Sequence, residues 1–504
     1  MLQFPNLLLS FLLIFVSFLL LHLLKTLKPN LPPGPWQLPF IGSLHHIAIN
    51  ALTHHSFLSL ARKYGPLFHL KLGQINFIVA SSSSTASEIL KTHDQIFASR
   101  PTMLAVKTIA YNSIGIGFSP YGPYWRQMRK ICSQELLSSK KVKFFGFIRD
   151  EESLKIVERI GRGSGSTTLK VNMTEIFMDV LNVNIMRAAF GKDWESNRER
   201  LLKALKETMM LLPLLRLADL FPSLGFVISV LDGSRGRMKN VRREIDVILD
   251  EIIAEHVIKR EAQGEGEGEE EDFVDVLLRV MEKGEFQIPL AVENIKAVIL
   301  DMLVGATETT SGTLDWAMTE LIRHPEIMHR AQLEIREAFR GKTIIEESDI
   351  NKLDYLKMII KETLRLHPPL PLLIPRICNK ETKLLGFTIP SKSWVVVNAW
   401  AIGRDPDNWE NPESFHPDRF KECTVDFMGT KYDYIPFGAG RRICPGMAFA
   451  LAGIEHFLAL LLFHFDWELP DPKVFDVDEG LAGSARRKND LYLLARPYSP
   501  ILDE

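Results

Sequence analysis

The chain has few cysteines, and none of them is part of a closely spaced pair. Cys132, Cys378, Cys423 and Cys444 are scattered over 504 residues, without a CxxC motif. This spacing argues against a disulfide-stabilised scaffold and against a zinc ribbon. It is consistent with a reducing compartment.

The sequence also lacks an excess of basic residues. Lys and Arg number 60 against 62 Asp and Glu, a net charge of −2, which argues against nucleic-acid binding. Nucleotide-binding motifs are missing as well. "GIGFSP" from Gly115 and "GRGSGS" from Gly161 do not complete GxGxxG between a strand and a helix, and no GxxxxGK[ST] occurs. We therefore expect no nicotinamide, flavin or ATP fold within this chain.

The first segment lacks charge altogether. From Phe4 to Leu24 the sequence reads "FPNLLLSFLLIFVSFLLLHLL", close to the ~20 apolar residues that cross a bilayer as a helix. A cleaved signal peptide would have basic residues before this run and a small-residue cleavage site after it. Here Lys25 and Lys28 follow the run instead, which places the body on the cytosolic side. The pattern predicts a permanent membrane anchor over residues 1–25.

The anchor leads through a proline-rich elbow into one large body. Pro32, Pro33 and Pro35 lie in the elbow, residues 26–45, where they prevent a helix from continuing. Residues 46–504 read as a single domain. It has a predicted hairpin over 67–82, helices over 244–260 and 294–324, and an acidic surface loop over 263–272.

A cysteine lies in an unusual loop near the C-terminus. "PFGAGRRICPG", from Pro436 to Gly446, combines three glycines with two arginines around Cys444. Glycines allow sharp turns, and arginines favour the thiolate, which is a better metal ligand or nucleophile than the thiol. The alternative is a tight turn before a helix with an ordinary buried cysteine. The fixed spacing of Phe437, Gly440, Arg442, Cys444 and Gly446 favours a functional loop.

Charged and polar residues form three further clusters. Glu362 and Arg365 in "KETLRLHPP" face the same side of a helix, and Arg419 in "FHPDRF" offers another cation. In "VGATETT", Glu308 and Thr309 interrupt an otherwise apolar helix. A polar pair in such a helix is costly unless its groups are satisfied or functional.

Together these motifs resemble the cytochrome P450 family of haem-thiolate monooxygenases, over nearly the whole chain. "PFGAGRRICPG" matches the family's cysteine loop, "ETLR" with "FHPDRF" its glutamate–arginine–arginine triad, and "WRQMRK" its WxxxR element. The anchor, "PPGP", "WAIGRDP" and "DFMG" further resemble plant microsomal members, in the branch rich in terpenoid hydroxylases. The resemblance implies a mainly α fold with a small β part and haem between the long central helix and the cysteine-loop helix.

The resemblance also implies roles for particular residues. Cys444 would be the axial ligand of the iron of haem b. The buried triad of Glu362, Arg365 and Arg419 would be structural and not catalytic. The other cofactor-binding residues implied are Arg442, Trp125, Arg129 and Arg376 as propionate partners, and Phe437, Gly438 and Gly446 in the cysteine loop.

Glu308 and Thr309 are implied as catalytic residues. By resemblance Thr309 would hydrogen-bond dioxygen, and the pair would relay protons to it. Alternatively, Thr309 bonds to the carbonyl four residues earlier and bends the helix. This chain has Gly305-Ala306 where relatives usually have Ala-Gly, so the methyl of Ala306 is expected to crowd the oxygen groove or reshape the pocket.

Apolar segments indicate the substrate class, and a basic cluster indicates a partner. The expected pocket walls are almost without charge and suit a lipophilic small molecule; they are residues 103–116, 209–217, 299–304, 370–374 and 481–482. Alternatively, these residues are ordinary core. The cations Arg129, Lys130, Lys140, Lys141 and Lys143 would dock an acidic flavoprotein, by resemblance the NADPH-cytochrome reductase of the same membrane, unless they are an ordinary solvated cluster.

The sequence thus predicts a monooxygenase anchored in the endoplasmic reticulum membrane, using NADPH through its partner. It would insert one oxygen atom from O2 into a terpenoid in plant specialised metabolism. Alkaloid, phenylpropanoid or coumarin substrates remain alternatives. An oxygen-independent isomerase or lyase is disfavoured by the retained Glu308 and Thr309. A non-catalytic haem sensor or membrane scaffold is the alternative of another class.

Overall fold

The computed structural model describes most of the body of the chain. The described residues are 30–47, 52–164, 169–191, 194–212, 215–263, 271–284, 286–342, 345, 347–473, 475–480 and 484–498. The predicted anchor, residues 1–25, and most of the acidic loop lie outside them. Within the described residues the fold is mainly helical with three small sheets, as the sequence predicts.

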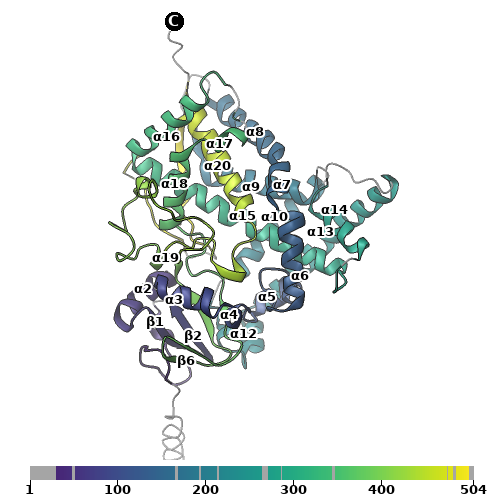
Figure 1. Cartoon of the computed structure of the whole chain (residues 1–504). Helices are drawn as coiled ribbons and strands as arrows, with labels where there is room; N and C mark the ends of the chain where they lie inside the picture. Colours follow the sequence, from purple (N-terminus) through teal and green to yellow (C-terminus); the bar gives the residue numbers. More distant parts are fainter. Residues whose placement is uncertain are drawn as a thin grey trace, which may run out of the picture.

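Helices make up the larger part of the molecule, and a β-rich part lies at one end (Figure 1). The helices are α2 (Thr53–Tyr64), α3 (Ser83–Ser87), α4 (Asp94–Phe97), α5 (Leu104–Ile109), α6 (Pro123–Ile131), α7 (Ser139–Phe144), α8 (Gly146–Ser164), α9 (Met173–Phe190), α10 (Arg198–Leu211), α11 (Leu217–Leu220), α12 (Gly225–Leu231), α13 (Ser234–Gln263), α14 (Phe273–Lys283), α15 (Val292–Arg323), α16 (Pro325–Ala338), α17 (Glu347–Ile350), α18 (Asp354–Leu366), α19 (Ala399–Ile402) and α20 (Met447–His464).

The strands form sheets of four, three and two strands. Their orders are β1-β2-β7-β4, β3-β9-β8 and β5-β6. β1 and β2 are antiparallel and turn at Gly73, which has a positive φ of 57°, so the predicted hairpin is confirmed. The strands are β1 (Leu67–Leu72), β2 (Ile75–Ala80), β3 (Leu169–Asn172), β4 (Arg376–Ile377), β5 (Thr382–Leu384), β6 (Phe387–Ile389), β7 (Trp394–Val397), β8 (Phe465–Glu468) and β9 (Tyr492–Pro497).

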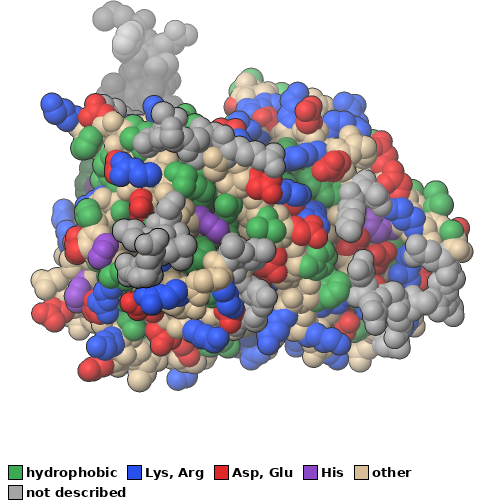
Figure 2. Space-filling model, turned by 90° about the horizontal axis from the view of Figure 1, so that it is seen from above, with side chains coloured by type: hydrophobic (Ala, Val, Ile, Leu, Met, Phe, Trp, Pro, Cys, Tyr) green, Lys and Arg blue, Asp and Glu red, His purple; other side chains and the backbone are tan. Residues whose placement is uncertain are grey.

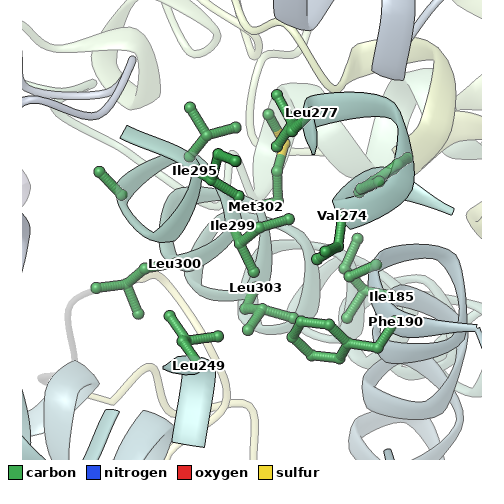
Figure 3. Packing of buried hydrophobic residues seen from close by; sticks show 14 of the residues in the cluster. Ile185, Phe190, Leu249, Val274, Leu277, Ile295, Ile299, Leu300, Met302 and Leu303 are labelled. Atoms are coloured by element: carbon green, nitrogen blue, oxygen red, sulfur yellow. The ribbon is translucent and has the colours of Figure 1, made fainter. Parts of the chain in front are cut away.

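The long helix α15 crosses the core, where it packs against α9, α14, α18 and α20. Ile299, Met302 and Leu303 on this helix contact a cluster that includes Phe190 of α9 and Val274 of α14 (Figure 3). These side chains are almost fully buried. The prediction that residues 299–304 form a pocket wall is therefore wrong for most of them, because the neighbouring helices cover this side of α15.

The Glu362 network is buried, as predicted. The carboxylate accepts two hydrogen bonds from Arg365, at 2.7 and 2.8 Å, and one from the Arg419 Nε at 2.9 Å. The His416 amide adds a fourth at 2.8 Å. Because Glu362 and Arg365 are almost completely inaccessible, this pair compensates charges that water cannot reach.

Among the described residues, α20 is the single helix long and apolar enough to cross a bilayer by length and composition. More than half of its apolar window is buried inside the protein. Its side chains belong to the core clusters shared with α15 and α18. α20 is therefore a core helix that starts directly after the cysteine loop.

Candidate active site

The cysteine loop folds back on itself just before α20. Gly438 and Gly440 have positive φ values of 71° and 69°, which side chains rarely adopt. A Cβ on Gly440 would also collide with the backbone carbonyl of Leu90. The loop is closed by the Cys444 amide, which donates to the Phe437 carbonyl at 2.9 Å. The two glycines thus fix where the thiol emerges.

Cys444 is partly exposed as a residue, whereas its thiol is surrounded by protein. Burial raises its pKa, whereas the Gly446 amide and Arg129 of α6 lower it. The cation that favours the thiolate is therefore Arg129, and not the loop's own arginines as the sequence suggested. Since burial dominates, a positive metal ion at the sulfur would be what makes the thiolate form prevail.

Two glycines leave open space at this site. Apart from their chain neighbours and, for Gly305, the backbone of its own helix, no atom of the described residues lies within 4 Å of where a Cβ of Gly446 or of Gly305 would stand. Gly305 lies midway along α15, which packs against the cysteine-loop helix α20. The partly exposed Cys444 and the open space at Gly305 of the central helix suit a flat cofactor together with a substrate.

Arginines gather beside the loop. The Arg442 guanidinium stacks on Trp125 at 4.1 Å and donates to the carbonyls of Ala98, Ile116 and Ser119. Burial and the neighbouring Arg376 and Arg129 lower its pKa to about 9.

Arginines outnumber acidic residues at this site. Arg376 pairs with Asp94 at 2.9 Å and donates to the Ala439 carbonyl at 3.0 Å. Arg100, which the sequence analysis missed, is buried, and its pKa is well below its usual value through burial and repulsion by Arg376 and Arg442. Among the described residues Arg129 forms no ion pair. Because buried cations repel one another, the cluster suits a dianionic group such as the two propionates of haem.

Glu308 and Thr309 have separate partners in this structure. Glu308 accepts a hydrogen bond from the Ser484 hydroxyl at 2.8 Å. Thr309 donates to the Gly305 carbonyl at 2.7 Å, which is the backbone contact considered as the alternative. Ala306 packs against the hydrophobic cluster around α9 and α14, so its methyl contacts the core, while Gly305 faces the open space.

The other predicted pocket walls fall into three groups. Leu373 lies 3.9 Å from where a Cβ of Gly438 would stand, so the 370–374 segment adjoins the cysteine loop. Met210 and Leu217 are more than half exposed, and the prediction that they line a pocket is wrong. In the 103–116 stretch six apolar side chains are core, namely Met103, Ala105, Val106, Ile109, Tyr111 and Ile116, and residues 481–482 lie outside the described residues.

The five residues of the predicted basic docking cluster differ in their exposure to solvent. Arg129 is partly buried and acts on Cys444, and the Lys141 ammonium donates to the Glu271 carbonyl at 3.2 Å. Lys130, Lys140 and Lys143 are exposed. The surface that remains available to an acidic partner is therefore smaller than the sequence suggested.

Comparison with known proteins gives the family. The family model described as Cytochrome P450 matches residues 32–494. The chain is 48% identical over 497 residues to premnaspirodiene oxygenase of Hyoscyamus muticus, covering 97% of each chain. It is 47% identical over 498 residues to desmethyl-deoxy-podophyllotoxin synthase of Sinopodophyllum hexandrum, covering 98% of this chain and 97% of the relative.

A zebra fish cytochrome P450 solved with abiraterone has a similar fold. The TM-score is 0.75 at 23% identity, covering 89% of this chain and 100% of that one. The chain belongs to the cytochrome P450 family and is a monooxygenase close to plant oxygenases. The family implies a haem held by a cysteine thiolate.

Proposed function

We propose that this protein inserts one oxygen atom from O2 into a C–H or C=C bond of a lipophilic terpenoid. The observation that carries the proposal is the site itself. The partly exposed Cys444 lies beside a cluster of arginines, and Gly305 on the central helix borders open space. The likeness to an oxygenase whose name refers to premnaspirodiene supports a terpenoid substrate.

Haem, when bound, supplies oxygen activation, which a thiolate ligand favours. Cys444 would bind the haem iron as a thiolate, and Arg442, Arg376, Arg129 and Trp125 would hold the haem propionates. In the cysteine loop, Phe437 and Gly438 shape the turn, and the Gly446 amide lowers the pKa of the thiol. The same loop thereby sets both the place and the basicity of the ligand.

Thr309 and Glu308 are the proposed proton-handling residues. The Thr309 hydroxyl needs only to rotate away from the Gly305 carbonyl to donate into the open space on the same side of α15. Glu308 is buried and accepts a hydrogen bond from the Ser484 hydroxyl, and its carboxylate is the proposed source of the proton that replaces the one Thr309 donates.

Replacing Thr309 with Val tests this role. We expect product formed per NADPH consumed to fall at least about tenfold, because a methyl cannot donate a proton. The absorbance of the reduced, carbon monoxide-bound protein should stay unchanged, since the substitution leaves Cys444 in place. Thr313 offers a matched control, because its hydroxyl also bonds a carbonyl four residues earlier on α15. Equal coupling in both valine variants would contradict the proposal.

Phenylpropanoid-derived substrates are a second candidate. The specific reason is the likeness, at 47% identity, to desmethyl-deoxy-podophyllotoxin synthase. Turnover assays in membranes with NADPH and a plant cytochrome reductase distinguish the two candidates. We expect oxygenated product from premnaspirodiene and none from a podophyllotoxin-type lignan. The reverse result would replace the terpenoid proposal, and no reductase-dependent product from either substrate would contradict both substrate classes.

An exposed apolar surface at the β-rich end supports membrane association. Phe226 and Leu231 of α12 are 63% and 82% exposed, and Phe40 is 88% exposed. The turn at Gly73 joins these segments. The Gly73 amide donates a hydrogen bond to the Ile41 carbonyl, and the Gln74 amide donates one to the Leu220 carbonyl. The described chain begins near here, at Asn30, which pairs with β6 (Figure 1).

The opposite end of the molecule has a different surface. Seen from above, acidic and basic side chains intermingle there, and hydrophobic ones form small separate areas (Figure 2). A lipid surface is therefore the proposed neighbour of the α12 end alone, in agreement with the proposed anchor over residues 1–25 and attachment to the endoplasmic reticulum.

The double variant Phe226→Ser, Leu231→Ser tests this contact. In a chain without residues 1–29, we expect binding to phosphatidylcholine vesicles to weaken at least about tenfold, since each large apolar side chain contributes ~1.5–3 kcal/mol when buried. The matched control is the double variant Ile258→Ser, Leu333→Ser, because both residues are exposed and apolar and lie on α13 and α16. If both double variants bind vesicles equally, α12 is not the membrane contact.

A further inference from the structure

The loop of residues 114–119 has no helix or strand, yet side chains from several elements hold it. It connects the turn that ends at Ser113 to α6 and includes Gly117 and Phe118, which are half-buried. Its carbonyls accept hydrogen bonds from Tyr124 at Ile114 (2.7 Å), from Arg100 at Gly117 (3.1 Å) and from Arg442 at Ser119.

One peptide of this loop is held from both sides. The Ile116 carbonyl accepts from Trp125 Nε1 at 3.0 Å and from Arg442 Nη1 at 3.1 Å. The amide of the same peptide, on Gly117, donates to the Asp301 carboxylate of α15 at 2.9 Å. A cation at the oxygen and an anion at the amide polarise the peptide in the same direction, so each bond strengthens the other.

The ionised Asp301 carboxylate is energetically unfavourable in this environment. No Lys or Arg among the described residues forms an ion pair with it, and burial raises its pKa to about 6. The titratable groups that face it are the Tyr124 hydroxyl and the Cys132 thiol, and burial raises the pKa of each to about 12. Both are uncharged at neutral pH, so only amides stabilise the carboxylate.

The packing around the carboxylate is close as well. A Cβ on Gly115 would overlap the Asp301 carboxyl group, whereas one on Gly117 would lie 3.5 Å from it, an ordinary contact. Asp301 is also one helical turn before Gly305, on the side of α15 that borders the open space. The loop therefore lies directly on the carboxylate, beside the open space at Gly305, which is the substrate space of the proposed function.

We propose that Asp301 is a positioning residue that seats the 114–119 loop on α15 and, through the Ile116–Gly117 peptide, couples the central helix to Arg442 in the arginine cluster. The loop then forms a fixed wall of the substrate space. This inference goes beyond the proposed function and does not depend on which lipophilic substrate the protein oxidises.

Hydrogen–deuterium exchange of the full-length holoprotein tests the seating of the loop. In Asp301→Ala we expect amides of residues 114–119 to exchange about tenfold faster, the effect of one lost charge-assisted hydrogen bond. Asp301→Asn keeps one acceptor and should give a smaller increase. Asp315→Asn is the matched control, because Asp315 is also a carboxylate of α15 with a raised pKa, bonded to Thr174 instead of to the loop.

Global stability separates positioning from a purely structural role. Because the folded-state pKa of Asp301 is raised from 3.8 to about 6, the ionised carboxylate lowers stability as the pH rises through that window. Asp301→Asn at pH 7.5 should therefore leave the unfolding temperature unchanged or raised while loosening the loop. A lower unfolding temperature with uniformly faster exchange would overturn the proposal.

A pair of glycine variants tests the proposal without touching the carboxylate. Gly115→Ala should push the loop off Asp301 and reproduce the local exchange of Asp301→Ala, whereas Gly117→Ala should resemble the parent protein. Equal exchange in the two variants would overturn the proposal, even if Asp301→Ala fails to fold. Turnover is not needed for this test, so its result is independent of the terpenoid assignment.

Discussion

Replacing Cys444 with Ala is expected to abolish both the thiolate-type spectrum and all monooxygenase activity. A methyl group has no lone pair to bind iron, and no other cysteine lies in a turn shaped as this one is, with Gly438 and Gly440 at positive φ. Without a thiolate the electron density that favours O–O cleavage is lost. The measurement is the absorbance of the reduced, carbon monoxide-bound protein in membranes.

Cys423→Ala is the matched control for this prediction. Cys423 is also a free and partly accessible cysteine, and it lies in a different cluster, with Trp409 and Phe420. We expect this variant to keep the strongly red-shifted Soret band and its turnover. A red-shifted band that survives in Cys444→Ala would show that Cys444 is not the ligand.

Replacing Glu362 with Gln should cost about 3–5 kcal/mol of folding free energy, because it leaves two guanidinium groups without a counter-charge in a buried place. Arg365 would keep only carbonyl partners, among them Gly403 at 2.6 Å. Such a loss is a large share of the ~5–15 kcal/mol that stabilises a typical folded protein. Urea unfolding, together with the yield of folded protein, measures the effect.

Asp418→Asn is the control for the loss of a carboxylate. Asp418 pairs with Arg330 at 2.8 Å, yet their side chains are 34% and 51% exposed. Water screens this pair, so we expect a loss of less than about 1 kcal/mol. If Glu362→Gln is no more destabilising than Asp418→Asn, the buried network does not stabilise the fold as its geometry indicates.

Much of the fold followed from short-range patterns. The hairpin of β1 and β2, the helix α15 and the facing pair of Glu362 and Arg365 were all predicted from spacing alone. In each case the covalent geometry of a helix or strand fixes which side chains share a face. The form of the cysteine loop was predictable for the same reason, since glycine spacing limits a short backbone.

Exposure was predicted less well than secondary structure. Ile299, Met302 and Leu303 are core, and Met210 and Leu217 lie at the surface, although all five were expected to line a pocket. An apolar side chain has the same sequence signature whether it faces a neighbouring helix, a cavity or a membrane. Only the packing of α9 and α14 against α15 decides between these environments.

The sequence by itself determined the family motifs, the cysteine at their centre and the helix that carries Glu308 and Thr309. The tertiary structure alone decided that Arg129 acts on the thiol, that Arg100 joins the arginine cluster and that Asp301 holds the 114–119 loop. The Gly117 amide and its acceptor are 184 residues apart. Local rules fix neighbours along the chain, but partners so distant meet only where the helices pack.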